Sequence, residues 1–188
     1  MKGTDFGSLV HRILQIYNGE YPGDDEFTSL DLTSEQIHIV KKEVYRLLDN
    51  YRSTEIYFIS TTAEKKLKER RFACQLNEFQ IEGAMDLVLI INGACHIIDF
   101  KTDKVQESQI SSKIDYYRPQ ISAYAIAAAK LIGNDNITCS LIFLHPGIVH
   151  TEKFDTNILR ETEESLLKTF KQIQSEKTWK RNTSACPC

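Results

Sequence analysis

The spacing of hydrophobic residues predicts two amphipathic helices near the N-terminus. Residues 5–18 carry apolar side chains three or four positions apart, which places them on one side of a helix. Gly19 and Gly23 then favour a helix end and a loop. A second series with the same period follows Thr33 or Ser34, either of which can cap a helix. The stripes are Phe6, Leu9, Val10, Ile13, Leu14 and Tyr17, then Ile37, Val40, Val44, Leu47 and Leu48.

From about Glu64 the pattern changes to that of extended strands. Three consecutive strands are predicted, in the segments KLKERRFACQL, FQIEGAMDLVLII and ACHIIDFKT. Asn92-Gly93 separates the second from the third, and this dipeptide favours a two-residue hairpin turn. The second and third strands are therefore expected to form an antiparallel hairpin.

The C-terminal part alternates between helix and strand. A long helix is predicted from about Ser111 to Leu131, then the strands CSLIFLH and GIVHTEKF, then a helix from about Thr156 to Ser175. The order αα-βββ-α-ββ-α predicts an α/β fold with a central mixed sheet flanked by helices. Because the sequence has no internal repeat or linker, we expect a single domain over residues 1–188. We also expect this domain to be a piece of a larger protein.

The hairpin register brings charged residues together. With a two-residue turn, Asp86 lies directly opposite Asp99, so both side chains project from one face, roughly 4.5–5.5 Å apart at Cβ. Lys101 shares that face because side-chain direction alternates along a strand. The flanking residues are apolar on both faces, as expected of a buried hairpin. They are Met85, Leu87, Leu89, Ile98 and Phe100 on one face, and Val88, Ile90 and Ile97 on the other.

Two opposed carboxylates in an apolar setting indicate a metal site. They repel each other and lose hydration, unless a cation or a shared proton neutralises them. Paired carboxylates suit Mg²⁺ or Mn²⁺, and a nearby lysine can orient a water molecule for attack on a phosphodiester. The alternative is that Asp99 and Lys101 are solvated edge residues, since Asp-x-Lys is common by chance. The apolar flanks and the pairing with Asp86 favour the functional interpretation.

Composition restricts the environment and the partners. The five cysteines, Cys74, Cys95, Cys139, Cys186 and Cys188, are odd in number, and three lie in apolar strands, so we expect buried thiols rather than a disulfide framework. The net charge of −3 argues against a broad basic surface for nucleic acid, although a local basic groove can coexist with it. The sequence has no signal peptide and no apolar run of the roughly 18 residues that span a bilayer, so we expect a cytoplasmic protein without membrane contact.

Four short motifs occur along roughly residues 3–145. They are Gly3-Thr4-x-x-Gly7-x-x-x-His11, Gly83-Ala84-Met85-Asp86, Ile98-Asp99-Phe100-Lys101-Thr102-Asp103 and Tyr117-x-x-Gln120-x-x-x-Tyr124. Together, and in this order, they resemble the RecB-type branch of the PD-(D/E)xK nuclease superfamily, and their combination is more specific than any one of them. Helicase–nucleases of the RecB and AddA kind carry such a domain at their C-terminus.

The resemblance implies a restriction-endonuclease-like core and a role for each motif residue. It implies that His11, Asp86 and Asp99 ligate the metal, together with the backbone carbonyl of Phe100. It also implies that Lys101 is the catalytic lysine. A lone helical histidine is more often structural, but the glycine-containing motif around His11 favours the ligand interpretation.

A predicted helix adds further site residues. Tyr117, Gln120 and Tyr124 are three and four positions apart and share one helix face. The resemblance implies that Gln120 and Tyr124 reach the catalytic site, whereas the alanine-rich surroundings also suit tyrosines in a packed core. Glu69 resembles the acidic residue that begins the family's first strand, and a surface salt bridge is an equal alternative.

Together these observations predict a Mg²⁺- or Mn²⁺-dependent deoxyribonuclease. We expect DNA as substrate and a helicase motor in the same polypeptide or complex, with exonuclease action in DNA repair and recombination. Alternatives are a catalytically weak nuclease-like module for DNA binding or assembly in a helicase complex, and a stand-alone phage or CRISPR-associated nuclease. Some relatives hold an iron–sulfur cluster with one cysteine before the core and three after it. No cysteine precedes Cys74, so such a cluster is not expected.

Overall fold

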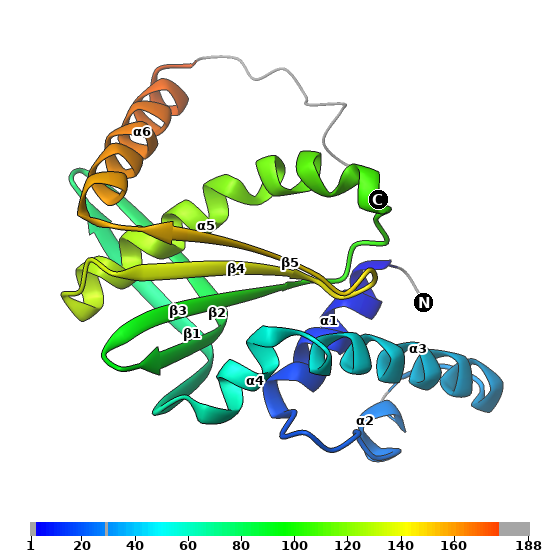
Figure 1. Ribbon diagram of the computed structural model, residues 1–188. Helices are drawn as coiled ribbons and strands as arrows, with labels where there is room; N and C mark the ends of the chain where they lie inside the picture. Colours follow the sequence, from blue (N-terminus) through cyan, green and yellow to red (C-terminus); the bar gives the residue numbers. More distant parts are fainter. Residues whose placement is uncertain (1–2, 29, 177–188) are drawn as a thin grey trace.

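A five-stranded mixed sheet separates two groups of helices in the computed structural model, which describes residues 3–28 and 30–176 (Figure 1). The strand order is β1-β2-β3-β4-β5. β3 and β4 are parallel, and the other neighbouring pairs are antiparallel, which confirms the expected mixed sheet. The strands are β1 Lys65–Leu76, β2 Phe79–Ile91, β3 Ala94–Lys101, β4 Ile137–Phe143 and β5 Ile148–Phe154.

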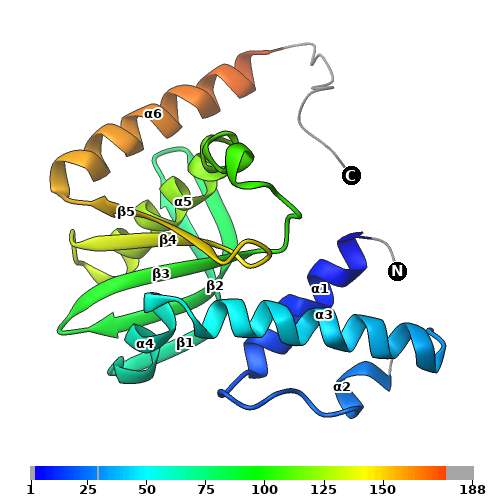
Figure 2. The same ribbon diagram turned by 45° about the vertical axis from the view of Figure 1, so that its right-hand side comes forward.

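The helices cover both faces of the sheet. The N-terminal helices lie on one side, and α5 and α6 lie on the other (Figures 1 and 2). They are α1 Gly3–Ile16, α2 Asp25–Thr28, α3 Ser34–Arg52, α4 Glu55–Thr62, α5 Ile110–Ile132 and α6 Thr156–Ser175, with a 3-10 turn at Glu107–Gln109. The short helices α2 and α4 were not predicted, because four and eight residues are too few to show a clear helical period.

Local sequence features define several of these boundaries. Thr33 caps α3 by accepting from the backbone N–H of Gln36, whose side chain accepts from the N–H of Thr33. The predicted turn between β2 and β3 is present, and both its residues have positive φ, 49° at Asn92 and 76° at Gly93. Asparagine and glycine adopt this conformation at low cost, so this pair fixes the hairpin register.

The β2–β3 register matches the prediction, but only over part of its length. Pairing runs from Ile91 with Ala94 to Leu87 with Ile98 and ends there, one residue before Asp86. The β1–β2 pairing also omits Asp86 and its partner position Glu69, a non-glycine residue with φ of 48°. The sheet is therefore interrupted on both sides of β2 at Asp86.

This interruption changes which side of the sheet the next residue faces. Leu87 and Leu89 pack with Ile98 and Phe100 in the core beneath the N-terminal helices. Met85 instead belongs to the core on the α5 side. The expectation that Met85 shares a face with Leu87 is therefore wrong, because strict alternation assumes an uninterrupted strand.

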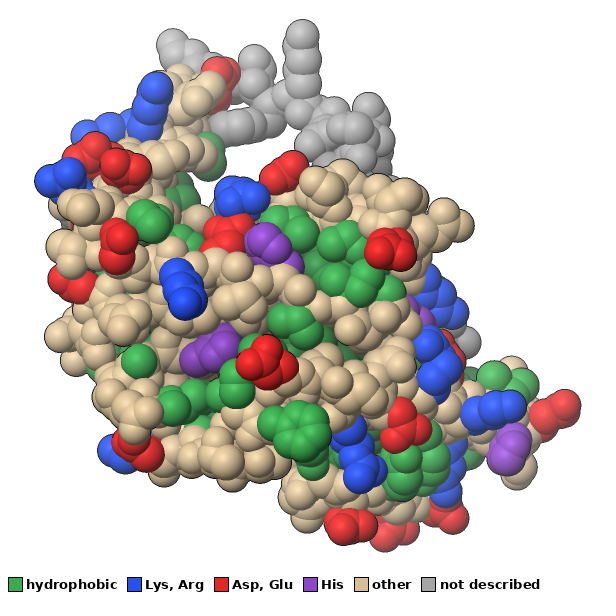
Figure 3. All heavy atoms as spheres, viewed as in Figure 1, with side chains coloured by type: hydrophobic (Ala, Val, Ile, Leu, Met, Phe, Trp, Pro, Cys, Tyr) green, Lys and Arg blue, Asp and Glu red, His purple; other side chains and the backbone are tan. Residues whose placement is uncertain are grey.

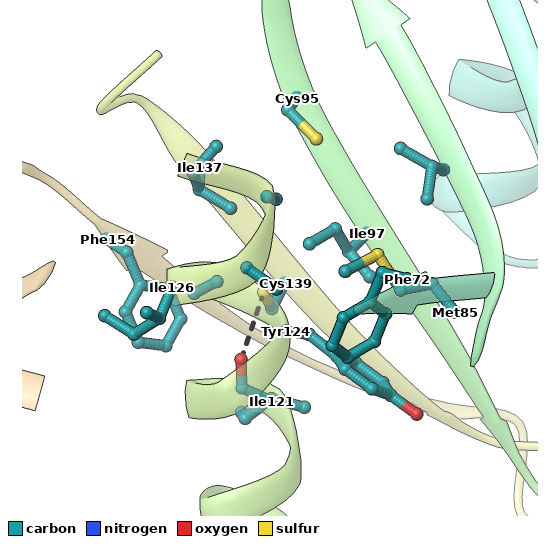
Figure 4. Packing of buried hydrophobic residues seen from close by; sticks show 14 of the residues in the cluster. Phe72, Met85, Cys95, Ile97, Ile121, Tyr124, Ile126, Ile137, Cys139 and Phe154 are labelled. Atoms are coloured by element: carbon teal, nitrogen blue, oxygen red, sulfur yellow. Dashed lines mark hydrogen bonds between the residues drawn. The ribbon is translucent and has the colours of Figure 1, made fainter. Parts of the chain in front are cut away.

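The core on the α5 side contains buried side chains of that helix, of α6 and of all five strands. Figure 4 shows side chains of α5 packed against the strands, with the Cys139 thiol directed at the carbonyl of Ile121. Cys74, Cys95 and Cys139 are buried free thiols, as expected, whereas Cys186 and Cys188 lie outside the described residues. Among the described helices, none is both long and apolar enough to cross a membrane.

Candidate active site

Asp86 occupies the point where β2 and β3 separate. One carboxylate oxygen accepts a hydrogen bond from the backbone N–H of Phe100, at 2.8 Å, and thereby replaces a ladder bond. The other lies 3.1 Å from Nδ1 of His11 on α1. The carboxylate is therefore held between β3 and α1.

Asp99 is buried on the α5 side of the same gap. Its side chain is 5% exposed and lies 2.6 Å from the Lys101 ammonium. Gln120 donates to its other oxygen at 3.2 Å. Burial is the main cause that raises the pKa of Asp99 to about 6, with the charge of Asp86 acting in the same direction and that of Lys101 opposing it.

The two carboxylates thus contact opposite helical layers. Asp86 contacts His11 of α1, while Asp99 contacts Gln120 of α5. The expected direct pairing of Asp86 with Asp99 on a common face is wrong, because the strands part at this point and the Phe100 N–H binds Asp86 instead. The groups nevertheless remain close enough for their charges to interact.

Lys101 is fixed by three neighbours. Besides Asp99, its ammonium donates to Gln120 Oε1 at 2.8 Å and lies 3.8 Å from the centre of the Tyr117 ring. Tyr124 accepts from Gln120 at 2.6 Å and donates to the carbonyl of Ala84 at 2.8 Å. The structure therefore places Gln120 and Tyr124 at the predicted site, where they connect α5 to β2 and β3.

His11 reaches the site because α1 approaches the end of β3 closely. A Cβ atom added at Gly7 would lie 3.0 Å from Oγ1 of Thr102, so a larger residue would push the helix away. His11 is one helical turn beyond Gly7. Its hydrogen bond to Asp86 is the main cause that raises the pKa of the imidazole, against the opposing effect of burial.

Gly83 permits a similar close approach on the other side. A Cβ atom there would lie 2.9 Å from the Phe72 ring, which packs edge-on against Tyr124 with centroids 5.8 Å apart. Two motif glycines therefore have a physical explanation: each allows an element that carries a site residue to pack closely.

Asp103, Lys113 and Tyr117 form a second set of polar contacts beside Lys101, which was not predicted from the sequence. Asp103 accepts from Lys113 at 2.7 Å and from the Tyr117 hydroxyl at 2.8 Å. Although burial opposes the shift, these hydrogen bonds lower the pKa of Asp103. Lys113 lies one turn before Tyr117 on α5, so the helical spacing could have indicated it. The group holds the Tyr117 ring beside Lys101.

Glu69 lines the same cleft as Asp86 and His11. Among the described residues it forms no ion pair, so the surface salt bridge considered for it is not present. Its positive φ coincides with the interruption of the sheet at Asp86.

Comparisons with known proteins decide the family. Two solved structures are similar at low identity: SSO0001, with 13% identity and a TM-score of 0.38, and protein VC1899 from Vibrio cholerae, with 14% identity and a TM-score of 0.28. The matches cover 88% of this chain and 86% of SSO0001, and 90% of this chain and 51% of VC1899. No curated protein matches the sequence. A family model described as the PD-(D/E)XK nuclease superfamily matches residues 1–188. The chain belongs to this superfamily.

Membership in the PD-(D/E)XK superfamily makes the chain a nuclease by family, and such nucleases generally use Mg²⁺ or Mn²⁺. The donors at the site fit such an ion in chemical kind, since they include the carboxylates of Asp86 and Asp99 and an imidazole. One buried oxygen of Asp99, Oδ2, has only the ion pair with Lys101 and no hydrogen bond of normal geometry. Within the described part of the chain, no three histidine, cysteine or acidic side chains already form a metal-binding group.

The remaining histidines have the surface and core roles expected for them. His96 contacts the hydroxyl of Ser140, His150 contacts Glu152, His145 lies between Arg46 and Glu43, and His38 is exposed. None of these contacts involves the predicted site residues.

Proposed function

We propose that the protein is a Mg²⁺- or Mn²⁺-dependent deoxyribonuclease that hydrolyses phosphodiester bonds at the gap between β2 and β3. The proposal is supported chiefly by the way Lys101 is held at 2.6 Å from Asp99, beside Asp86 and His11. Asp86, Asp99, His11 and the carbonyl of Phe100 would hold the metal. When bound, the metal would supply positive charge at the cleaved phosphate and lower the pKa of water.

The residues around Lys101 would direct its charge toward the reaction. The Tyr117 ring and Gln120 fix the position of the ammonium, so it needs little reorganisation when negative charge develops on the phosphate. Lys101 would also orient the attacking water. Tyr124 and Gln120 would maintain the distance between α5 and the two strands.

We further propose that cleavage is exonucleolytic and that the domain works with a helicase motor of the RecB or AddA kind in DNA repair and recombination. The order and spacing of the four motifs support this subtype. Linear and circular single-stranded DNA of equal length would distinguish the modes, because an exonuclease leaves the circle intact. Stimulation of cleavage by ATP, when the candidate motor is added, would test the association.

The nuclease proposal is tested with purified protein, Mn²⁺ and end-labelled DNA. We expect cleavage by the wild type and none by the Asp99→Asn variant. Equal products from both proteins would contradict the proposal. Calorimetric titration with Mn²⁺ tests the alternative of a DNA-binding or assembly module, which predicts no metal binding and no cleavage.

A further inference from the structure

A cleft extends from the proposed site to a part of the protein that the mechanism does not use. It has a volume of about 250 Å³ and lies between α1, α4 and the strands β1 and β2. One end contains His11 and Asp86, and the lining from β1 contains Glu69 as well as Lys66 and Lys68. The cleft is thus continuous with the proposed catalytic residues and also carries two positively charged side chains of β1.

Lys68 is a half-buried ammonium without a negatively charged partner. It donates to the backbone carbonyl of Tyr17, and no ion pair involves it or Lys66 among the described residues. Burial lowers the pKa of Lys68, and the nearby charge of Lys66 acts in the same direction. A buried cation is costly unless it is paired, so this part of the cleft suits an anion.

The surroundings suit a nucleotide in particular. Tyr17 and Tyr57 line the cleft, and aromatic side chains are common contacts for unpaired bases. The volume is below the roughly 300–1,000 Å³ of drug-sized ligand pockets, so the cleft has room for one small unit and not for a base pair. On the face shown in Figure 3, basic and acidic side chains are interspersed, so this face has no continuous basic surface for DNA.

We propose that this cleft receives one unpaired nucleotide of a DNA strand next to the cleaved phosphodiester, and that Lys66 and Lys68 bind its phosphate. The inference rests on the proposed nuclease function, since it takes the neighbouring phosphate to be the one cleaved at Asp86. It assigns the substrate as a single-stranded end, or an end that has been unwound.

A structural alternative exists for these lysines, because β1 is an edge strand and lysine on an edge strand prevents association with other sheets. Lys65 separates the two explanations. It lies on the same strand, is exposed, and does not line the cleft. If the lysines serve only to protect the edge, substitutions of Lys65 and Lys68 should change DNA binding to a similar extent. If Lys68 binds a phosphate, its substitution should weaken DNA binding more than substitution of Lys65.

The test measures binding in EDTA, where cleavage is prevented, by fluorescence anisotropy of a labelled twelve-nucleotide oligothymidylate. We expect Lys68→Gln to weaken binding roughly tenfold, as for a lost charged hydrogen bond, and Lys68→Arg to retain it. Lys66→Gln should act in the same direction, and Lys65→Gln should change binding less than about twofold. Each lost phosphate contact should also lower the slope of log affinity against log salt by about 0.7. Thermal melting and gel filtration verify that each variant is folded and unassociated.

Several outcomes would overturn the inference. Lys68→Gln without effect, or Lys65→Gln as damaging as Lys68→Gln, would exclude a phosphate site in the cleft. An equal effect of Lys68→Gln on a blunt hairpin duplex would exclude the unpaired nucleotide. Binding that depends on Lys68 in a protein that never cleaves DNA would contradict the nuclease proposal alone, whereas cleavage that depends on Asp99 with binding indifferent to Lys68 would contradict this inference alone.

Discussion

The β2–β3 hairpin has two halves with opposite properties. From Leu87 to Ile98 the strands are paired, and apolar side chains fill both faces. One residue further, at Asp86, the pairing ends and a carboxylate takes the N–H of Phe100. The paired half, here called the closed half, supplies stability and register. The unpaired half, called the open half, places polar groups between two helical layers. The proposed catalytic groups therefore lie where the regular strand pairing stops, and the paired part of the hairpin fixes their positions.

The largest expected effect is a loss of cleavage activity when a carboxylate of the open half is removed. Replacing Asp99 or Asp86 with asparagine removes a negative charge from the proposed metal site, and we expect cleavage to fall by about three orders of magnitude or more, as for loss of groups that act as a unit. Rates are measured with Mn²⁺ and end-labelled single-stranded DNA. The far-ultraviolet circular dichroism of each variant should match the wild type. Residual activity within tenfold of the wild type would show that the open half is not the catalytic centre.

The converse substitution tests the closed half. Leu89 is fully buried beneath the N-terminal helices, and Leu89→Ala should lower the free energy of unfolding by about 2–5 kcal/mol through lost burial and a cavity. Urea denaturation measures this change. Activity per folded molecule, measured well below the melting temperature, should stay within a few-fold of the wild type. A large loss of activity without a loss of stability would remove the distinction between the halves.

A smaller effect is expected where α5 supports the open half. Gln120→Ala removes the contacts to Asp99 and Lys101, and we expect cleavage to fall about tenfold to a hundredfold, equivalent to about 1.4–2.7 kcal/mol. Tyr116→Phe on the same helix is the matched control, because Tyr116 is exposed and keeps its ring. Equal rates for Gln120→Ala and the wild type would show that the Lys101 position does not depend on α5.

The sequence predicted the closed half better than the open half, for physical reasons. Asn92-Gly93 determines the turn locally, so the register could be derived from two residues. The long helix was also predicted, although Pro119 lies inside it. The failure at Met85 and Asp86 coincides with an interruption of the pairing opposite Glu69 on the neighbouring strand β1, and the periodicity of β2 alone contains no information about such a break.

The residues of the site divide in the same way. His11, Gln120 and Tyr124 came from the resemblance to a family, because contacts between α1, α5 and the hairpin span long distances along the chain. Composition and spacing offered no means to place His11 beside Asp86. The cleft with Lys66 and Lys68 was missed altogether, since a lysine on an edge strand has the same sequence pattern whether or not it faces a cavity.

A pH dependence of stability is also expected to originate in the open half. Burial raises the pKa of Asp99 from 3.8 to about 6, so between these values the folded protein binds more protons than the unfolded chain. The free energy of unfolding contributed by this group must then decrease as pH rises through this window, by an amount on the order of 3 kcal/mol. Asp99→Asn cannot titrate and should lack that decrease.

Urea denaturation at pH values from 4 to 7 in EDTA measures the free energy of unfolding of both proteins. Comparing their slopes against pH removes the contribution of the other titrating groups, which the two proteins share. Leu89→Ala is the control: it is less stable at every pH and should keep the wild-type slope. Identical slopes for Asp99→Asn and the wild type would mean that the Asp99 carboxylate is not destabilised by burial.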